Sequence, residues 1–273
     1  MHHTKEQKFL YSRVAVLLAT VGWIVSGFAG LKGFSFWYGG FVLCFWVAFG
    51  LVNFHQKTSL WLAVRHRIPF LLLFGALTGF LILLDRAALN FHLWFYPTYH
   101  GLQFIWVYGV LYPFAALDLI ELYYFTAKFL GEHLAFTQKP LSRAHRAIDS
   151  LEGLLFIAMT SGILAGALGW SISITAIAFL VLAWIVLYLA KLSFHLRHPK
   201  HFAYLLFLSA AVAAFFNEFP NTIAREWVYV YSALPFWNTE LLSVPLWLWF
   251  GWLWFMLFTL RFWVTIVLHP KVK

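Results

Sequence analysis

Long apolar segments, separated by short polar ones, run through the whole of this chain of 273 residues. A helix needs roughly 20 mostly apolar residues to cross the hydrocarbon core of a bilayer. Hydropathy locates the centres of such segments better than their ends. The pattern predicts eight membrane-spanning helices, at residues 9–30, 35–54, 68–90, 102–130, 151–170, 172–192, 202–218 and 243–268.

The apolar residues form continuous runs and do not alternate with polar ones. Strands of a transmembrane β-barrel alternate lipid-facing apolar residues with polar residues facing inward, so the pattern excludes a barrel. The first run is too long for a cleavable signal peptide, and further spans follow it. We therefore expect an all-α fold, a polytopic transmembrane helix bundle that forms a single membrane domain over residues 1–273.

Composition and charge agree with this class and add an orientation. Hydrophobic residues make up 63% of the chain and charged residues 11%, whereas soluble domains contain about 25% charged residues. Of the 19 lysines and arginines, all except Lys32, Arg86 and Arg225 fall on one side of the predicted spans. Such a bias is the positive-inside signal, which predicts both termini in the cytoplasm and a location in the cell membrane.

The basic excess is expected to contact anionic lipid head groups on the cytoplasmic face, with no nucleic acid as partner. Neither a cofactor nor a metal ion is expected. His195, His198 and His201 have a spacing that would suit a metal, but Pro199 breaks the helical register between them, which favours interfacial histidines. The single cysteine, Cys44, lies inside the second span, so an intrachain disulfide is excluded.

Two parts of the chain share a pattern when one is shifted by 133 positions. Each part has an acid near the outer end of a helix, then Trp-x-Tyr, then a long helix that ends in Thr-x-basic-Phe. This predicts two four-helix halves, residues 1–130 and 151–273, joined by a cytoplasmic loop at 131–150 and related by an axis along the membrane normal. The matched residues are Asp85 with Glu218, Trp94 with Trp227, Tyr96 with Tyr229, Thr126 with Thr259, Lys128 with Arg261, and Phe129 with Phe262.

Acidic residues inside the spans are the candidates for chemistry. Each costs at least ~2.5–3.5 kcal/mol on insertion, so such residues are retained mostly beside partners or polar cavities. Asp118 and Glu121 lie three positions apart, on one face of the fourth predicted span. Two nearby carboxylates repel each other, which can leave a proton available for donation. We predict Asp118 and Glu121 as catalytic acid and base, with Asp85 and Glu218 as counterparts nearer the outer surface, in the same site or in a second one.

Polar and aromatic residues at the outer ends of the third and seventh spans are the predicted substrate-binding residues. For the tryptophans and tyrosines, the alternative is an interfacial aromatic belt with a re-entrant or interfacial helix. The predicted residues are Asn90, Trp94, Tyr96, Asn217, Asn221, Arg225, Glu226, Trp227 and Tyr229.

The acid, the Trp-x-Tyr and the following proline and acids together resemble carotenoid-modifying membrane proteins of the lycopene cyclase and carotenoid hydratase type. The resemblance covers about half the chain. It implies acid-catalysed carbocation chemistry on an isoprenoid, in which a carboxylic acid protonates a double bond and aromatic faces stabilise the cation. The family has the pattern Pro-x-Glu-Glu-x-x-Phe-Phe in each half; here the acids come later after Pro113 and none follows Pro245. The first copy contains Asp85, Trp94-Phe95-Tyr96-Pro97, Pro113, Asp118 and Glu121, and the second contains Glu218, Trp227-Val228-Tyr229 and Pro245.

The leading hypothesis is therefore a cofactor-independent enzyme that modifies an isoprenoid or another membrane lipid. One alternative is a proton-coupled transporter, which parallel repeats and intramembrane acids also favour. Another is a non-catalytic scaffold subunit whose aromatic residues pack lipid and partners. A lipid-sized pocket lined by acids favours the enzyme, a water-filled path favours the transporter, and acids sealed in internal contacts favour the scaffold.

Overall fold

The computed structural model describes residues 5–130, 143–195, 198–230, 239–242 and 244–268. Over these residues the fold is helical, with four strands of two residues each. The helices are α1 (Lys5–Leu31), α2 (Trp37–Val52), α3 (Ser59–Arg65), α4 (Arg67–Asn90), α5 (Phe104–Trp106), α6 (Tyr112–Phe129), α7 (Arg143–Ala167), α8 (Ile174–His195), α9 (Pro199–Ala224) and α10 (Leu246–Trp263).

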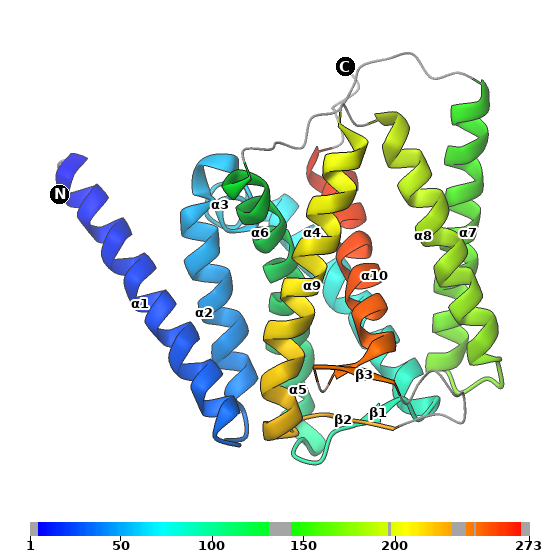
Figure 1. The fold of residues 1–273 in the computed structure, drawn as a ribbon, viewed down its shortest axis with the longest axis horizontal. Helices are drawn as coiled ribbons and strands as arrows, with labels where there is room; N and C mark the ends of the chain where they lie inside the picture. The colour runs from blue at the N-terminus through cyan, green and yellow to red at the C-terminus, as the bar shows by residue number, and fades with distance from the viewer. Residues whose placement is uncertain (1–4, 131–142, 196–197, 231–238, 243, 269–273) are drawn as a thin grey trace.

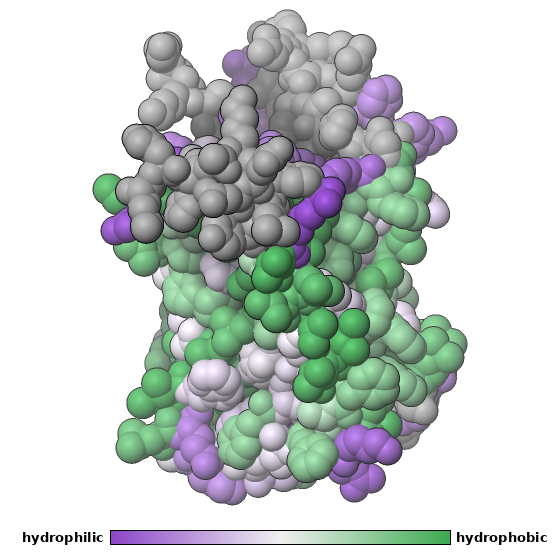
Figure 2. Space-filling model, turned by 90° about the vertical axis from the view of Figure 1, so that its left-hand side faces the viewer, coloured by the Kyte–Doolittle hydropathy of each residue, from purple (hydrophilic) through white to green (hydrophobic). Residues whose placement is uncertain are grey.

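Seven helical segments in the described part of the chain are long and apolar enough to cross a membrane, and α2 is a shorter apolar helix at the second predicted span. The helix α1 begins and α10 ends at the same end of the bundle (Figure 1). An apolar band on the face over α1 lies between polar groups at the two ends (Figure 2). The chain is thus a helical membrane protein, as the apolar pattern indicates. The number of eight spans and their orientation stay predictions.

Most helix bounds lie within a few residues of the predicted spans, and two differ more. The helix α7 begins at Arg143, inside the expected loop 131–150, because a helix can continue in water beyond its apolar part. Residues 131–142 of that loop lie outside the described residues. The helix α9 continues to Ala224 and includes Pro220. Hydropathy falls at Asn217 and Glu218, so the apolar pattern ends before the helix does.

Four helices, α4, α6, α9 and α10, form the centre of the bundle, with the pairs α1–α2 and α7–α8 on opposite sides (Figure 1). Each outer pair packs against one helix of the centre: α7 contacts α4, and α1 contacts α9. In the centre, Phe80 of α4 stacks on Phe258 of α10 with ring centroids 3.8 Å apart. Ala116 of α6 and Ala214 of α9 are fully buried. Because lipid tails are as apolar as these side chains, close packing of small and aromatic residues stabilises the bundle.

Two short strands, β1 (Trp94–Phe95) and β2 (Val228–Tyr229), pair antiparallel at the end of the bundle opposite the start of α1 (Figure 1). Trp94 lies opposite Tyr229, and Phe95 lies opposite Val228. The strands follow α4 and α9, so their pairing brings the two Trp-x-Tyr motifs together. A second pair, β3 (Glu240–Leu241) and β4 (Val244–Pro245), precedes α10.

Candidate functional site

A cavity of about 310 Å³ is lined by residues of α2, α4, α6, α7, α8, α9 and α10 and by the segments around β1 and β2. Small-molecule sites occupy roughly 300–1,000 Å³, so its size suits a ligand. Most of the lining side chains are aliphatic or aromatic, such as Leu81, Ile177 and Phe255, and Asp85 and Glu218 line it as well. The fold therefore brings the two matched acids into one apolar cavity.

Four side chains donate hydrogen bonds to the carboxylate of Asp85. Oδ1 accepts bonds from Trp94 Nε1 at 3.0 Å, from the Tyr96 hydroxyl at 2.8 Å and from the Tyr112 hydroxyl at 2.5 Å. Oδ2 accepts one from the Tyr108 hydroxyl at 2.9 Å. The hydroxyls of Tyr96 and Tyr112 also contact each other. A buried carboxylate is costly without such donors, and this set satisfies both oxygens.

Three side chains donate to the carboxylate of Glu218 in a similar arrangement. Trp227 Nε1 donates to Oε2 at 3.2 Å, and the Tyr229 hydroxyl lies 2.9 Å from both oxygens. Trp252 Nε1 of α10 donates to Oε1 at 2.8 Å. The Trp and Tyr of each motif come nine and eleven residues after the acid in both copies.

The equal spacing has a geometric cause. Each acid lies on the last turns of its helix, and the chain then reverses into a short strand. Side chains two positions apart in a strand point to the same side, so the Trp and the Tyr both face back toward the acid. The rings of Trp94 and Tyr229 meet edge to face across the strands, with centroids 6.3 Å apart. The two acid clusters are therefore neighbours.

The hydroxyls of Tyr96 and Tyr229 lie outside the spanning helices. Burial, together with the nearby carboxylates of Asp85 and Glu218, raises the pKa of both hydroxyls well above the usual value of 10.0. Both tyrosines therefore stay protonated at neutral pH and remain hydrogen-bond donors.

Sequence reasoning missed Tyr108, Tyr112 and Trp252 as partners of the acids. Tyr108 and Tyr112 lie four positions apart, on one face of the helical segment that leads into α6, and this spacing of polar-tipped aromatic residues in an apolar run was a usable signal. The turn Val107–Leu111 between them is π-helical, a feature frequent at functional sites. Trp252 had no such signal, because the sequence of α10 contains several other tryptophans.

Asp118 and Glu121 do not line the large cavity. The carboxylate of Glu121 accepts hydrogen bonds from Ser59 Oγ at 2.6 Å, Asn53 Nδ2 at 3.0 Å and the backbone N–H of Leu60 at 3.1 Å. Glu121 thus caps the first turn of α3 and is sealed in internal contacts. Asp118 lines a separate, smaller chamber. The two acid pairs lie in separate places, and a catalytic role for Asp118 and Glu121 stays a prediction.

Of the nine predicted substrate-binding residues, Trp94, Tyr96, Trp227 and Tyr229 line the cavity. The other five do not line it. Asn90 Nδ2 donates to the carbonyls of Gly166 and Ala167 at the end of α7. Asn221 bonds both the N–H and the carbonyl of Trp227. Arg225 ends α9 in the left-handed conformation, and Asn217 accepts a bond from the Tyr38 hydroxyl.

Glu226 joins the segment before β2 to the start of α2. Its carboxylate accepts a hydrogen bond from the Tyr99 hydroxyl at 2.7 Å and a longer one from the backbone N–H of Tyr38 at 3.4 Å. Burial raises the pKa of Glu226, and the hydrogen bonds from Tyr99 and the first turn of α2 oppose this in part. The residue acts as a cap supplied from a distant part of the chain.

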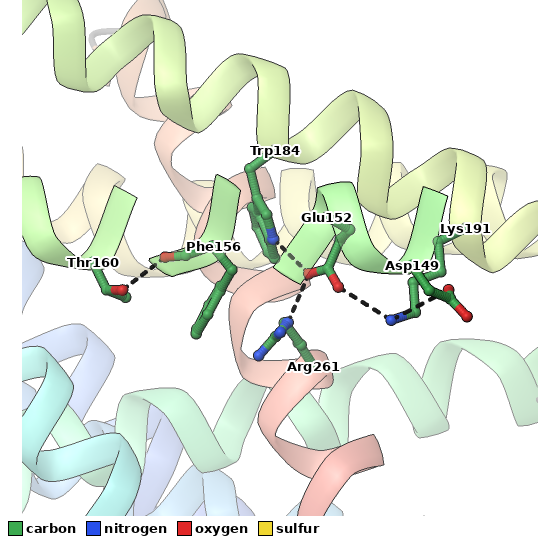
Figure 3. A network of polar contacts seen from close by, with 7 residues as sticks. All are labelled: Asp149, Glu152, Phe156, Thr160, Trp184, Lys191 and Arg261. Atoms are coloured by element: carbon green, nitrogen blue, oxygen red, sulfur yellow. Dashed lines mark hydrogen bonds and ion pairs between the residues drawn. The ribbon is translucent and has the colours of Figure 1, made fainter. Parts of the chain in front are cut away.

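A third cluster, unpredicted from the sequence, connects α7, α8 and α10 (Figure 3). The carboxylate of Glu152, 1% exposed, accepts bonds from Trp184 Nε1 and Arg261 Nε at 2.8 Å each and from Lys191 Nζ at 3.1 Å. The guanidinium of Arg261 lies over the ring of Phe156, 3.6 Å from its centroid. The cluster fixes three of the helices that line the cavity.

In the described part of the chain, no three His, Cys, Asp or Glu side chains lie close enough together to hold a metal ion. His198 and His201 stack with ring centroids 5.6 Å apart, while the side chain of His195 lies outside the described residues. No family model, no curated protein and no solved structure matches this chain.

Proposed function

We propose that this protein is a membrane enzyme that uses acid catalysis on an isoprenoid or a similar lipid, with Asp85 and Glu218 as the reacting groups. The main support is that both carboxylates line one apolar cavity of about 310 Å³. An apolar wall suits a hydrocarbon substrate, and general acid–base chemistry needs a pair of groups that can give and take a proton.

In this proposal Glu218 donates the proton and Asp85 accepts one. Asp85 has four donors and Glu218 has three. Hydrogen bonds to a carboxylate favour its ionised form, so the acid with more donors is the better candidate for the group that is kept ionised as the base.

The proposed step begins at a terminal carbon–carbon double bond. Its π electrons take the proton of Glu218 and form a C–H bond, which leaves a tertiary cation on the other carbon. The π electrons of a second double bond then close a ring, and an adjacent C–H loses its proton to Asp85 and forms a new double bond. The product is an isomer of the substrate. If water captures the cation instead and gives its proton to Asp85, the product is the hydrate. The rings of Trp247 and Trp254, which line the cavity, stabilise the cation.

The resemblance to carotenoid-modifying membrane proteins supports the same chemistry, since the acid and Trp-x-Tyr that carry it are the residues of the two clusters. We further propose the cell membrane as location, eight spans with both termini in the cytoplasm, and a parallel repeat of two halves. The repeat is supported by reciprocal contacts, α4 with α7 and α9 with α1. It is also supported by the pairing of Phe95 with its counterpart Val228, as a two-fold axis between them requires.

The transporter and the scaffold receive less support. A proton-coupled carrier needs a path for water or ions, whereas the cavity wall is mostly aliphatic and aromatic. Sealed acids favour the scaffold. Asp85 and Glu218 line the large cavity and Asp118 lines the smaller chamber, whereas Glu121 lines neither and is bonded through both of its oxygens.

The test is lipid extraction and mass spectrometry of an isoprenoid-producing host that expresses the wild type, Asp85→Asn or Glu218→Gln. Wild type should form a cyclised or hydrated isoprenoid. Each variant should lower its yield by roughly 10²-fold or more, the scale of general acid–base catalysis. Glu240→Gln, which changes an exposed acid that is not part of the cavity lining, is the matched control at equal membrane abundance. A lipid profile that wild type leaves unchanged would contradict the proposal and favour transport or scaffolding.

A further inference from the structure

A small chamber between α2, α6 and α9 adjoins a buried acid that the proposed reaction does not use. Its volume is about 10 Å³, close to the roughly 10–15 Å³ that one water molecule needs by this measure. Phe41, Phe45 and Phe216 form much of its wall, while Asp118 and Asn217 supply its polar groups. An apolar chamber of this size stays dry, but one with polar partners can hold water.

Asp118 has an oxygen suited to such a water. The side chain is 6% exposed, and its Oδ1 has no hydrogen-bond partner among the described residues. Glu121 on the same helix, Cys44 on α2 and the Tyr38 hydroxyl interact with it electrostatically, and none of the three is a cation. A water in the chamber would give its carboxyl group a hydrogen-bond partner.

A hydrogen-bonded link leads from the chamber to the large cavity. Asn217 Oδ1 accepts a bond from the Tyr38 hydroxyl at 2.6 Å. Tyr38 lines the large cavity, and its ring meets that of Trp227 with centroids 4.8 Å apart. The Tyr38 hydroxyl interacts electrostatically with both Asp118 and Glu218. Tyr38 thus lies between the chamber and the proposed proton donor.

We propose that the chamber is a hydration site through which Asp118 exchanges a proton with the cavity, with the Tyr38 hydroxyl as the connecting group. Its role rests on the proposed function, since the exchange reloads Glu218. Asp118 gives its proton to the chamber water, and the water gives one to the Tyr38 oxygen. The Tyr38 hydroxyl, which donates to Asn217 Oδ1 in the structure, turns to Glu218 and releases its own proton to that carboxylate. The proton taken up by Asp85 then returns through the cavity, the Tyr38 hydroxyl and the chamber water to Asp118, and all three acids regain their starting states. Asp118 touches no substrate and acts as a proton reserve.

Infrared spectroscopy of the full-length protein in lipid nanodiscs tests this exchange without any substrate. The wild type should show a carboxylic C=O band that is absent in Asp118→Asn and shifts after transfer to D2O. Tyr38→Phe should keep the band but exchange roughly tenfold more slowly or worse. Tyr204→Phe, which removes the hydroxyl of an exposed tyrosine, should exchange like wild type. A spectrum unchanged by Asp118→Asn, or exchange as fast in Tyr38→Phe as in wild type, would overturn the proposal.

Measurements of kcat and KM distinguish a failure of the proton exchange from a failure of the proposed reaction. If the reaction occurs, Tyr38→Phe and Asp118→Asn should lower kcat several-fold, roughly 3–10, with KM unchanged, because they slow reloading and not substrate binding. Glu218→Gln should abolish turnover. A host without new isoprenoid products would contradict the proposed reaction and leave the infrared result to decide the exchange. Slowed exchange in Tyr38→Phe together with an unchanged kcat in both variants would overturn the reloading role alone.

Discussion

Glu226 lies beyond the end of a spanning helix, yet its side chain is fully buried. Desolvation raises the pKa of Glu226 above its ordinary value of 4.5, although the Tyr99 hydroxyl and the N–H groups at the start of α2 favour the charged form. The folded protein therefore holds the proton of Glu226 more tightly than the unfolded chain does. The protonated side chain therefore stabilises the folded state, and this contribution is fully present below about pH 4.5. It is lost as the pH rises through the pKa that Glu226 has in the folded protein.

The expected outcome is a pH-dependent difference between wild type and Glu226→Gln. In wild type, the stabilising contribution of protonated Glu226 is lost as the pH rises above about 4.5, so the resistance to thermal unfolding falls. In Glu226→Gln the side chain is a neutral amide, and this pH-dependent loss does not occur. The measurement is thermal unfolding in detergent at several pH values between about 4 and 8, compared with Glu240→Gln as a control for an exposed acid. Parallel pH profiles for wild type and Glu226→Gln would contradict the prediction.

At the scale of single residues, the sequence signals differ in strength. Asp85, Trp94 and Tyr96 lie close together in the sequence, and the same spacing recurs at Glu218. This repetition made the motif recognisable. The donor Trp252 reaches Glu218 from a position 34 residues away, and no local pattern distinguishes it from neighbouring tryptophans. Asp118 and Glu121 share a helical face as predicted from their spacing, but the partners that seal Glu121 come from the segment before α3.

At the scale of elements, the cluster around Glu152 determines how firmly α10 is held by α7 and α8. Glu152 is 1% exposed and bonded to Arg261, Lys191 and Trp184, while Asp149 is 28% exposed and only 3.5 Å from Lys191. Removing one partner of a buried ion pair costs ~3–5 kcal/mol, whereas an exposed pair contributes ~0–1 kcal/mol.

We therefore expect Glu152→Gln to lower the free energy of unfolding far more than Asp149→Asn does. Both changes remove one negative charge from α7, so they are matched in chemistry and differ in burial. Unfolding by a denaturing detergent, followed by tryptophan fluorescence, measures the difference. Equal destabilisation by the two variants would mean that the contacts of Glu152 stabilise the helices no more than a surface pair does.

Apolar runs predicted the helices well because each run is a local property of the chain. The strands β1 and β2 escaped prediction, since two residues are too few for an alternating pattern. The π-helical turn Val107–Leu111 has no signature in hydropathy either. The start of α7 at Arg143 was missed because its first turns are polar, and a hydropathy pattern detects only the part of a helix that lies in the membrane.

At the scale of the whole molecule, the prediction concerns which end of the bundle faces the cytoplasm. Lys57 and His100 are both exposed, and the segments that contain them lie at opposite ends of the bundle (Figure 1). In a Cys44→Ala background, Lys57→Cys should resist a membrane-impermeant thiol reagent in intact cells, and His100→Cys should react. Permeabilised cells, in which both should react, provide the control. The reverse pattern would contradict the orientation predicted from the lysines and arginines.

The order of helices around the centre could not be predicted from the apolar pattern. Hydropathy identifies each span separately, and nothing in a run of leucines and phenylalanines specifies which other span it will contact. The contact of α1 with α9 and that of α4 with α7 depend on shape and on a few polar bonds between distant segments. The matched motifs were the one long-range signal, and they concern the residues that meet at β1 and β2.

The bond between Glu226 and the start of α2 joins residues 188 positions apart. A ribosome therefore inserts α2 into the membrane well before it synthesises the acid that caps this helix. During that interval the cavity beside Asp85 also lacks the part of its wall that α10 and β2 provide. The nascent chain must remain in the bilayer with an unfinished interior until α10 has emerged, and we expect chains truncated before that point to be substrates for membrane quality control.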